Sequence, residues 1–269
     1  MTFRSVVPAP PGALAQPRDR VLVADLLLLV GYLVGLAVPE FLLTVSVPLA
    51  ACGYGLLALA GCVALPFTAD KRSQALLPVL TAIPVVRLIV VTAPTADFAP
   101  IPRLGLLAVP TLIVIALAAR ACPPVRDLFQ VGPRGWPAQL AVVFTAVPLA
   151  PLVYLLMPPA PHARGDLPVI AAGALLALAV VPDEVLFRGM FQPAATAVAG
   201  GPVGLALSAL MYATTFIAYG DARAMVAALA VGLALGWCRQ RTGSVIGVVG
   251  ARVVLVLLVY LTLPAIFGG

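Results

Sequence analysis

The chain alternates long apolar runs with short polar breaks, and the length of these runs is typical of helices that cross a bilayer. A hydrocarbon core about 30 Å thick is spanned by about 20 helical residues. The runs that approach this length are 21–38, 41–66, 75–93, 104–119, 138–157, 168–187, 202–219, 224–238 and 243–265. The pattern therefore predicts an all-α, polytopic transmembrane helical bundle of about nine spans, and the shorter runs leave eight or ten open.

The composition supports the membrane class. Of the 269 residues, 62% are hydrophobic and 10% are charged, with a mean hydropathy of +1.13. A soluble protein of this length needs more polar surface. Residues 1–20 are rich in proline and basic, and the apolar run that follows starts too late and is too continuous for a cleaved signal peptide. We therefore predict a cytoplasmic N-terminal segment over 1–20 and a retained first span.

The arginine and lysine residues predict an orientation. Of the 16 Lys and Arg residues, Arg87 and Arg252 lie inside spans; with a cytoplasmic N-terminus, 11 others fall on the inner side and 3 in outer loops. Such a bias follows the positive-inside rule, and Trp136 and Trp237 fall at inner boundaries, as interfacial anchors do. We expect a multi-pass protein of the plasma membrane, whose net charge of +6 reflects orientation and not nucleic-acid binding.

Several ionisable residues remain within the spans or at their edges. They are Asp25, Arg87, Asp183, Glu184, Arg188 and Arg252. A charge at mid-bilayer costs roughly 2.5–3.5 kcal/mol, so six unpaired charges would total about 15–20 kcal/mol, more than a typical folding free energy. These residues are therefore expected to pair, to reach the interface or to line a wet cavity. The sequence leaves the partners of Asp25 and Arg87 open.

Half of these charges gather in the stretch VVPDEVLFRGMFQ, residues 180–192. Glu184 and Arg188 are four residues apart, which suits an ion pair on one helix face, and Pro182 is expected to kink the helix. With a rise of 1.5 Å per residue, Asp183 lies about 6 Å and Arg252 about 13 Å from the inner edge, a difference that an arginine side chain can bridge. Asp183, Glu184, Arg188 and Arg252 form either a structural ion-pair cluster or a functional site.

Three motifs in the second half of the chain resemble those of the CPBP family, the CaaX-protease and bacteriocin-processing intramembrane metalloproteases (also the Abi or type II CaaX prenyl endopeptidase group). The family motif EExxxR, often continued by FRG, is matched by DEVLFRG from Asp183. FxxxH is matched in context by SALMYATTF, with Tyr212 at the Phe position and Phe216 at the His position. The third motif, His and Asn four residues apart after a TGS-like start, is replaced by Arg252 and Val256.

This resemblance implies a catalytic position for each motif residue and also marks what has changed. In the family, glutamate and two histidines are thought to activate water, with a divalent metal, for peptide cleavage near the cytoplasmic face. A catalytic zinc is held by about three protein ligands. The single histidine, His162, lies in an outer loop, and an arginine at Arg252 would neutralise a neighbouring carboxylate. We therefore expect no metal at this site and no cofactor, with zinc required only if the enzyme is active.

The cysteines and glycine pairs add little to this interpretation. Cys52, Cys62, Cys122 and Cys238 are scattered without a CxxC pair, and we interpret them as small buried residues. Three GxxxG matches, beginning at Gly31, Gly232 and Gly243, indicate sites of close helix approach, but such matches arise easily by chance among 23 glycines.

The sequence leads to three functional hypotheses. The first is a CPBP-fold pseudoenzyme that acts as a scaffold, chaperone or subunit for another integral membrane protein. The alternative is an active CPBP-type intramembrane endopeptidase with a diverged site. The third is a transporter whose path is lined by Asp25, Arg87 and the 183–188 cluster. In domain terms, 21–134 would be additional N-terminal spans and 135–269 a CPBP-like membrane core.

Overall fold

The protein is an all-α bundle. The computed structural model describes residues 17–67, 71–95, 97–121, 129–131, 135–159 and 163–267, with the side chains of 17–25, 67 and 71–74 left aside. Within these ranges every regular element is a helix, which confirms the predicted fold class. The helices are α1 (Pro17–Leu42), α2 (Val47–Ala64), α3 (Lys71–Thr92), α4 (Pro100–Ala121), α5 (Gly135–Phe144), α6 (Ala146–Leu156), α7 (Val169–Glu184), α8 (Gln192–Ala199), α9 (Gly201–Thr214), α10 (Ala222–Thr242), α11 (Ile246–Leu257) and α12 (Leu263–Phe267).

Short helices of other types join several of these elements. The 3-10 helices are η1 (Leu65–Phe67) and η4 (Ile217–Tyr219), and the π-helices are η3 (Val185–Phe191) and η5 (Leu258–Thr262). Eight segments of the described chain are long and apolar enough to cross a membrane, and α1 contributes a shorter apolar stretch, Leu26–Leu42. These nine segments correspond to the nine predicted runs.

Two of the predicted boundaries are wrong. The first run was expected to end at residue 38, but α1 continues through Pro39 and Glu40 to Leu42. The run 168–187 was expected to end near Arg188, but α7, η3 and α8 form one continuous span, Val169–Ala199. A buried glutamine allows this continuation, because Gln192 donates a hydrogen bond of 2.8 Å to the carbonyl of Gly236 in α10. Asp183 therefore lies near the middle of its span and not close to one membrane edge.

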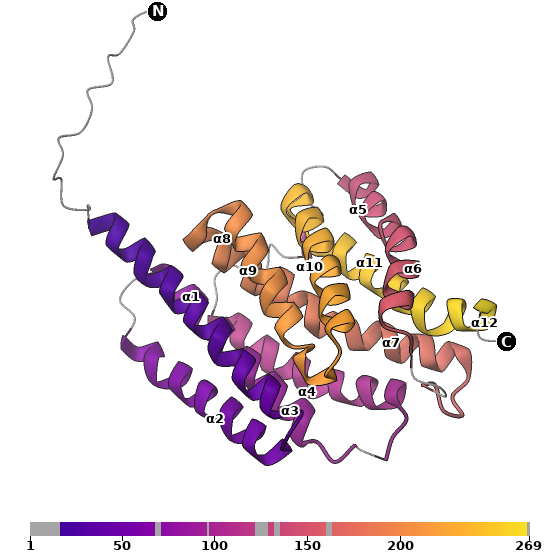
Figure 1. Ribbon diagram of the computed structural model, residues 1–269. Coiled ribbons are helices and arrows are strands. Elements are labelled where there is room, and N and C mark those ends of the chain that lie inside the picture. The colour runs from indigo at the N-terminus through magenta and orange to yellow at the C-terminus, as the bar shows by residue number, and fades with distance from the viewer. Residues whose placement is uncertain are drawn as a thin grey trace, which may run out of the picture.

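The helices pack in two groups that meet along α4, α7 and α9. In the first group, α2 packs against α1 and α3, and α3 packs against α4. In the second, α7 contacts α11, α9 lies between α8 and α10, and α5 and α6 cover α11. Figure 1 shows the first group along the lower side of the bundle, with α1 and α2 at the left and α4 below α7. The centre of the molecule is therefore enclosed by helices from both halves of the chain.

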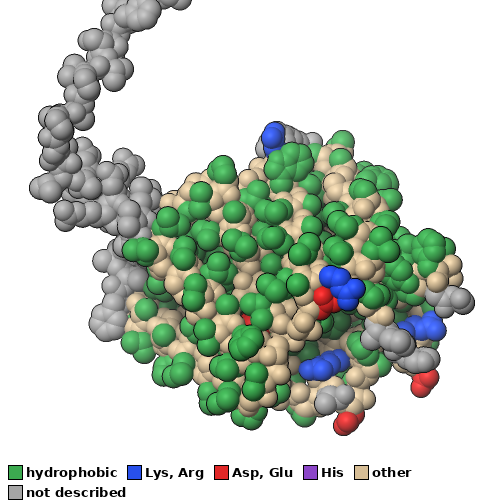
Figure 2. All heavy atoms as spheres, viewed as in Figure 1, with side chains coloured by type: hydrophobic (Ala, Val, Ile, Leu, Met, Phe, Trp, Pro, Cys, Tyr) green, Lys and Arg blue, Asp and Glu red, His purple; other side chains and the backbone are tan. Residues whose placement is uncertain are grey.

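The outer surface is strongly apolar. Large side chains such as Leu27, Leu155 and Ile170 are 65%, 74% and 88% exposed. Figure 2 shows hydrophobic side chains spread over the visible face, with few charged groups among them. Water would disfavour such a surface, whereas lipid tails match it. Together with the eight apolar helices, this surface identifies a multi-pass membrane protein.

A buried ion pair joins α1 to α3, and its arginine also contacts the second group of helices. Arg87 in α3 donates hydrogen bonds of 2.5 and 2.6 Å to the two carboxylate oxygens of Glu40 in α1. The same guanidinium donates to the carbonyl of Thr215, just after α9, at 3.3 Å. Glu40 is fully buried. The partner of Arg87, which the sequence left open, is therefore Glu40, an acid that the pattern of apolar runs placed between two spans. The side chain of Asp25 lies outside the described residues.

Candidate functional site

The motif residues come together at the centre of the bundle from α7, η3, α9 and α11, with Phe216 just before η4. Asp183 and Glu184 end α7, and Arg188 follows in the π-helical turn η3. Pro182 lacks a backbone N–H, so the helix loses one hydrogen bond immediately before this turn. π-helical turns within longer helices are frequent at functional sites. Here the turn places one carboxylate and one guanidinium of the motif in the protein interior.

Glu184 lies between two arginines. Its Oε2 is 3.4 Å from Nε of Arg188, and its Oε1 is 3.7 Å from Nε of Arg252 in α11. Glu184 and Arg188 are fully or almost fully buried, and Arg252 is 14% exposed. Two guanidinium groups therefore flank one buried carboxylate.

Tyr212 in α9 fixes both guanidinium groups. Its hydroxyl accepts a hydrogen bond of 2.6 Å from Nη2 of Arg252, and the Cζ atom of Arg188 lies 4.2 Å from its ring centroid. Phe187 contacts the same ring edge-on at a centroid distance of 5.3 Å. Cation–π contact of this kind stabilises a guanidinium that is removed from water. The residue at the family's Phe position thus acts here as a support for two cations.

The two positions that carry the second histidine and the asparagine in the family are apolar. Phe216 continues the aromatic column that begins with Tyr212, with ring centroids 5.2 Å apart, and Tyr219 stacks on Phe216 at 5.4 Å. Val256 is buried one turn after Arg252, and Phe216, Arg252 and Val256 line one cavity, which is described below. Neither side chain has a lone pair to offer a metal ion.

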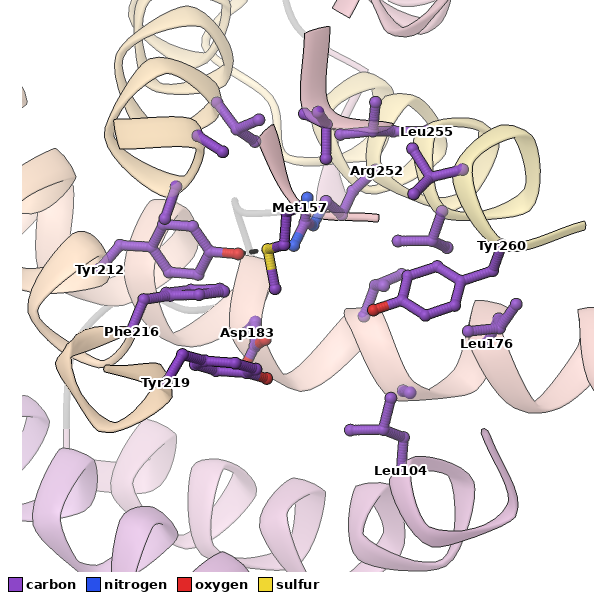
Figure 3. Close-up of a pocket in the computed structure, with 18 residues that line it drawn as sticks. Leu104, Met157, Leu176, Asp183, Tyr212, Phe216, Tyr219, Arg252, Leu255 and Tyr260 are labelled. Atoms are coloured by element: carbon purple, nitrogen blue, oxygen red, sulfur yellow. Dashed lines mark hydrogen bonds between the residues drawn. The ribbon is translucent and has the colours of Figure 1, made fainter. Parts of the chain in front are cut away.

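Asp183 takes no part in the ion pairs and faces open space instead. In the described part of the chain no cation lies within 4 Å of its carboxylate. Asp183 lines a cavity of about 120 Å³ together with Arg252, Phe216, Tyr219 and Tyr260. Figure 3 shows its carboxylate between Tyr219 and the cavity, with Tyr212, Phe216 and Tyr219 one below the other along one wall. The first acid of the motif is therefore the one that a bound molecule could reach.

A second cavity lies on the other side of Asp183. It has a volume of about 160 Å³, and the residues that line it include Arg87 of α3, Thr111 of α4 and Thr215, which follows α9. Asp183, Phe216 and Tyr219 line both cavities. A residue of the additional N-terminal helices, Arg87, thus faces the same region as the motif acids.

The charged centre leaves several buried polar atoms without hydrogen-bond partners. They include both carboxylate oxygens of Glu184, both terminal nitrogens of Arg188 and Nε of Arg252. Buried polar groups of this kind are normally satisfied by protein or by ordered water. The protein's own hydrogen bonds therefore leave the centre around Glu184 incompletely satisfied, next to the cavity at Asp183.

The residues present do not fit the divalent metal that the family resemblance implies. No group of three His, Cys, Asp or Glu residues in the described ranges could hold a metal ion. Asp183 and Glu184 are the only carboxylates of the motif, and two guanidinium groups already occupy the neighbourhood of Glu184. Cys238 packs instead with Val142, Ala146 and Val248 in a separate apolar cluster. His162 lies outside the described residues.

Two other sequence interpretations are corrected by the structure. Cys52 and Cys62 are exposed and not buried, because they lie on the lipid-facing side of α2, while Cys238 is buried as expected and Cys122 lies outside the described residues. Glu40 was missed as an intramembrane charge. A lone acid next to a proline between two apolar runs was the only signal for it, and this signal is equally typical of a loop.

Residues 165–258 match the family model described as type II CAAX prenyl endopeptidase Rce1-like. The matched region runs from the residues before α7 to the first residue of η5 and contains every motif position from Asp183 to Val256. No curated protein and no solved structure matches the chain. The family match, which covers about a third of the chain, confirms the resemblance of this region to the CPBP family, and the apolar helices identify an integral membrane protein.

Proposed function

We propose that this chain is a non-proteolytic CPBP-fold protein that serves as a scaffold, chaperone or subunit for another integral membrane protein. The observation that carries the proposal is the position of Glu184 between Arg188 and Arg252. The resemblance assigns the position of Arg252 to a histidine. A fixed positive charge now stands where a metal ligand would be required.

This arrangement opposes hydrolysis for two reasons. A general base must lie within hydrogen-bond reach of the proton that it abstracts, and two guanidinium groups 3.4 and 3.7 Å away already face the two carboxylate oxygens of Glu184. A divalent ion would also have to approach between these two cations, which repel it. Asp183 alone offers a free carboxylate, and a single carboxylate falls short of the ligands that a catalytic zinc needs.

The additional helices support the partner role. α1, α2 and α4 present apolar side chains such as Val34, Phe41, Leu56 and Ile113 on the outer surface. Arg87, which pairs with Glu40 inside this group, also donates a hydrogen bond to the carbonyl of Thr215 after α9, and this contact connects a partner bound on α1–α4 to the CPBP-type region. Crosslinking in native membranes should recover a reproducible membrane-protein neighbour. A chain that yields none under several crosslinkers would count against the role.

We also assign the plasma membrane as the location, with a cytoplasmic N-terminus. The bias of arginine and lysine toward one set of loops supports this orientation. In it, Arg239 and Arg241 lie at the cytoplasmic end of α10. Cysteine labelling at engineered loop positions from each side of the membrane tests the assignment.

The direct test of the inactive centre is a metal and peptidase assay on the purified full-length protein. We expect no stoichiometric zinc after incubation and dialysis, measured by plasma mass spectrometry, and no cleavage of prenylated CaaX-type peptides. Cleavage that is lost in Glu184→Gln and retained in Asp97→Asn, a loop control, would overturn the proposal and establish the endopeptidase.

A companion experiment rebuilds the family pattern. Phe216→His together with Arg252→His introduces two imidazoles beside Asp183, whose cavity both positions line. We expect this double variant to bind about one zinc ion, because it replaces a repelling cation by a ligand and supplies about three donors. Phe216→His alone is the control, and it should bind none because Arg252 remains.

A transport or ligand-binding function is the second candidate, and one specific observation favours it. Arg87 and Asp183 line one cavity, and Asp183 also lines the cavity on its other side. Membrane transporters often place ionisable residues along such paths. Uptake or efflux in vesicles that depends on Asp183 and is unaffected by Glu184→Gln would favour this function over a scaffold.

A further inference from the structure

The first cavity at Asp183 has room for a small molecule. Its volume is about 120 Å³, and an apolar cavity of about 150 Å³ can hold a molecule of the size of benzene. Aliphatic side chains such as Leu176, Val180 and Val259 form much of its lining. A ligand of this cavity is therefore small, and part of it is apolar.

Two opposite charges face this cavity without meeting. Asp183 of α7 and Arg252 of α11 both line it. Arg252 pairs with Glu184, and none of its nitrogens lies within 4 Å of an oxygen of Asp183. Figure 3 shows Asp183 and Arg252 apart, with Tyr212 to one side and Tyr260 to the other. A molecule that carries both a cationic and an anionic group can bridge them.

The charged atoms that face the cavity are accessible. The carboxylate oxygens of Asp183 have no hydrogen-bond partner in the described chain, yet neither is among the buried atoms that lack one, so both have free surface. The same is true of Nη1 of Arg252, whereas its Nη2 donates to Tyr212 and its Nε faces Glu184. A bound molecule therefore finds two acceptors at Asp183 and a donor at Arg252.

The charges around the cavity balance, and this balance restricts the net charge of a ligand. The two motif acids are matched in number by Arg188 and Arg252, and Arg87 is already paired with Glu40. A ligand with a net charge would leave one charge in excess in an apolar environment, which is costly. A molecule that has opposite charges and no net charge fits this centre.

The aromatic rings determine which end of such a molecule meets Asp183. Tyr219 stacks on Phe216 with ring centroids 5.4 Å apart, and Figure 3 shows the carboxylate of Asp183 beside the ring of Tyr219. Ring faces attract cations, so the position beside Asp183 favours an ammonium group. An anionic group then lies toward Arg252 and Tyr260, whose hydroxyl points into the cavity.

The cavity reaches the surface at one end of the bundle. Tyr219 and Leu104, which line it, are 62% and 40% exposed. Tyr219 ends its span next to the start of α10, and Arg239 and Arg241 lie at the other end of α10. In the orientation proposed above, in which these two arginines are cytoplasmic, a ligand enters from the outer side.

We propose that this cavity binds a small aliphatic α-amino acid, such as alanine or valine, as a zwitterion. The ammonium group donates to Asp183, the carboxylate accepts from Arg252, and the side chain packs against the aliphatic lining. The inference names a ligand for the ligand-binding function given above as the second candidate, on which it rests. It does not depend on the scaffold role.

Binding of tritiated L-valine to the purified full-length protein tests the site, with EDTA present throughout. Isobutylamine and 3-methylbutanoate are the competitors, because each has the valine skeleton and lacks one of the two charged groups. We expect both to compete at least about tenfold more weakly than unlabelled valine, since each loses a hydrogen bond between charged groups. Equal competition by either compound, or no binding of valine, would overturn the proposal.

The zinc requirement separates this proposal from the endopeptidase. Valine binding that appears only when zinc replaces EDTA would assign the cavity to a metal centre, and would overturn both this inference and the non-proteolytic function. Absence of valine binding with and without zinc would overturn this inference alone.

Asp183→Asn tests the acceptor. The amide keeps the shape of the side chain and removes its charge, so valine binding should fall at least about tenfold. Asp221→Asn is the matched control, because Asp221 pairs with Arg223 at the surface and does not line the cavity. Binding should be unchanged in the control. An equal loss in both variants would overturn the role of Asp183.

A variant that fills the cavity keeps the test decisive if Asp183→Asn does not fold. Ala179 lines the cavities on both sides of Asp183, so Ala179→Leu reduces the space without changing a charge. Valine binding should be lost in this variant. Ala60→Leu, at an exposed position of α2, is its control and should bind valine normally. Unchanged binding in Ala179→Leu would place the amino acid elsewhere and overturn the proposal.

Discussion

The two buried ion-pair sites of this protein differ in how completely their charges are satisfied. Glu40 meets Arg87 through two hydrogen bonds of 2.5 and 2.6 Å, one to each carboxylate oxygen. Glu184 meets Arg188 and Arg252 through single contacts of 3.4 and 3.7 Å, and both of its oxygens lack hydrogen-bond partners. The first site has the bidentate geometry of a strong pair. The second has the looser geometry of a polar pocket.

This difference suggests that the Glu40–Arg87 pair has a structural role, whereas the Glu184 site derives from the family's motif positions. The Glu40–Arg87 pair has a single cation and joins helices that are distant in sequence, so it holds α1 and α3 to the core beside Thr215. The Glu184 site has two cations around one acid and lies at the motif positions of the CPBP resemblance. We infer that the first was selected for assembly, and that the second keeps the framework of a reaction centre with its charges rearranged.

The largest effect is expected at the single pair. Arg87→Gln leaves Glu40 buried without a cation, which costs about 3–5 kcal/mol in the free energy of unfolding. Unfolding by SDS in mixed micelles measures this loss. Glu40→Gln combined with Arg87→Gln should recover a large part of it, because no buried charge remains unpaired. If Arg87→Gln alone were as stable as the wild type, the Glu40–Arg87 pair would not be the stronger of the two buried ion-pair sites.

A smaller effect is expected from the same substitution at the second site. Arg252→Gln leaves Glu184 with Arg188 as a remaining cation, and mainly removes the hydrogen bond to Tyr212. The expected loss is on the order of 1–3 kcal/mol, the cost of leaving a buried polar group unsatisfied. The same unfolding assay applies, with the exposed pair of Asp221 and Arg223 as control; Asp221→Asn should give no measurable change. A loss at Arg252 equal to that at Arg87 would contradict the comparison.

Helix contacts in the two halves can be compared through glycine. A Cβ at Gly247 in α11 would lie 2.6 Å from Oε1 and 2.9 Å from the backbone oxygen of Gln139 in α5. Gly247→Ala should therefore cost about 1–3 kcal/mol through overpacking, and it also strains the 2.9 Å hydrogen bond from Gly247 N–H to Gln139. Stability is again measured by SDS unfolding, and an unchanged value would show that α5 moves aside freely.

The smallest effect is expected at Gly31 in α1, where a Cβ would meet nothing within 4 Å. Gly31→Ala should leave stability unchanged or raise it by up to about 1 kcal/mol, because alanine favours the helix more than glycine does. The same assay measures it. A clear loss of stability would contradict the open space at Gly31 and would indicate that another helix packs against this face of α1 in the purified protein.

The sequence predicted the helical architecture well because its signal is local. A run of about 20 apolar residues is long enough to span the hydrocarbon core as a helix, and this property depends on the run itself and not on its neighbours. The approximate positions of all nine helical segments follow from this, as does the presence of charges among residues 183–188. Errors in the predicted span boundaries arose where a buried polar residue has an ion-pair or hydrogen-bond partner on another helix. Glu40 extends α1 because Arg87 neutralises it, and Gln192 extends the span of α7 because Gly236 accepts its hydrogen bond.

The candidate site was predicted as a set of residues but not as an arrangement. Periodicity indicated that Glu184 and Arg188 share a helix face, and depth indicated that Arg252 could reach the two acids. The sequence could not choose between Asp183 and Glu184 as the partner of Arg252, because that choice depends on helix rotation and on the π-helical turn after Glu184. In the structure Arg252 lies beside Glu184, and Asp183 turns toward the cavities.

By itself, the sequence determined that this protein lies in a membrane, as a helical bundle with several charges in its interior. Only the tertiary structure decided which charges meet, since Glu40 and Arg87 are 47 positions apart and Tyr212 and Arg252 are 40 apart. The physical reason is that burial of apolar surface depends on each segment alone, whereas satisfying a buried charge requires a particular partner from another helix at the same depth.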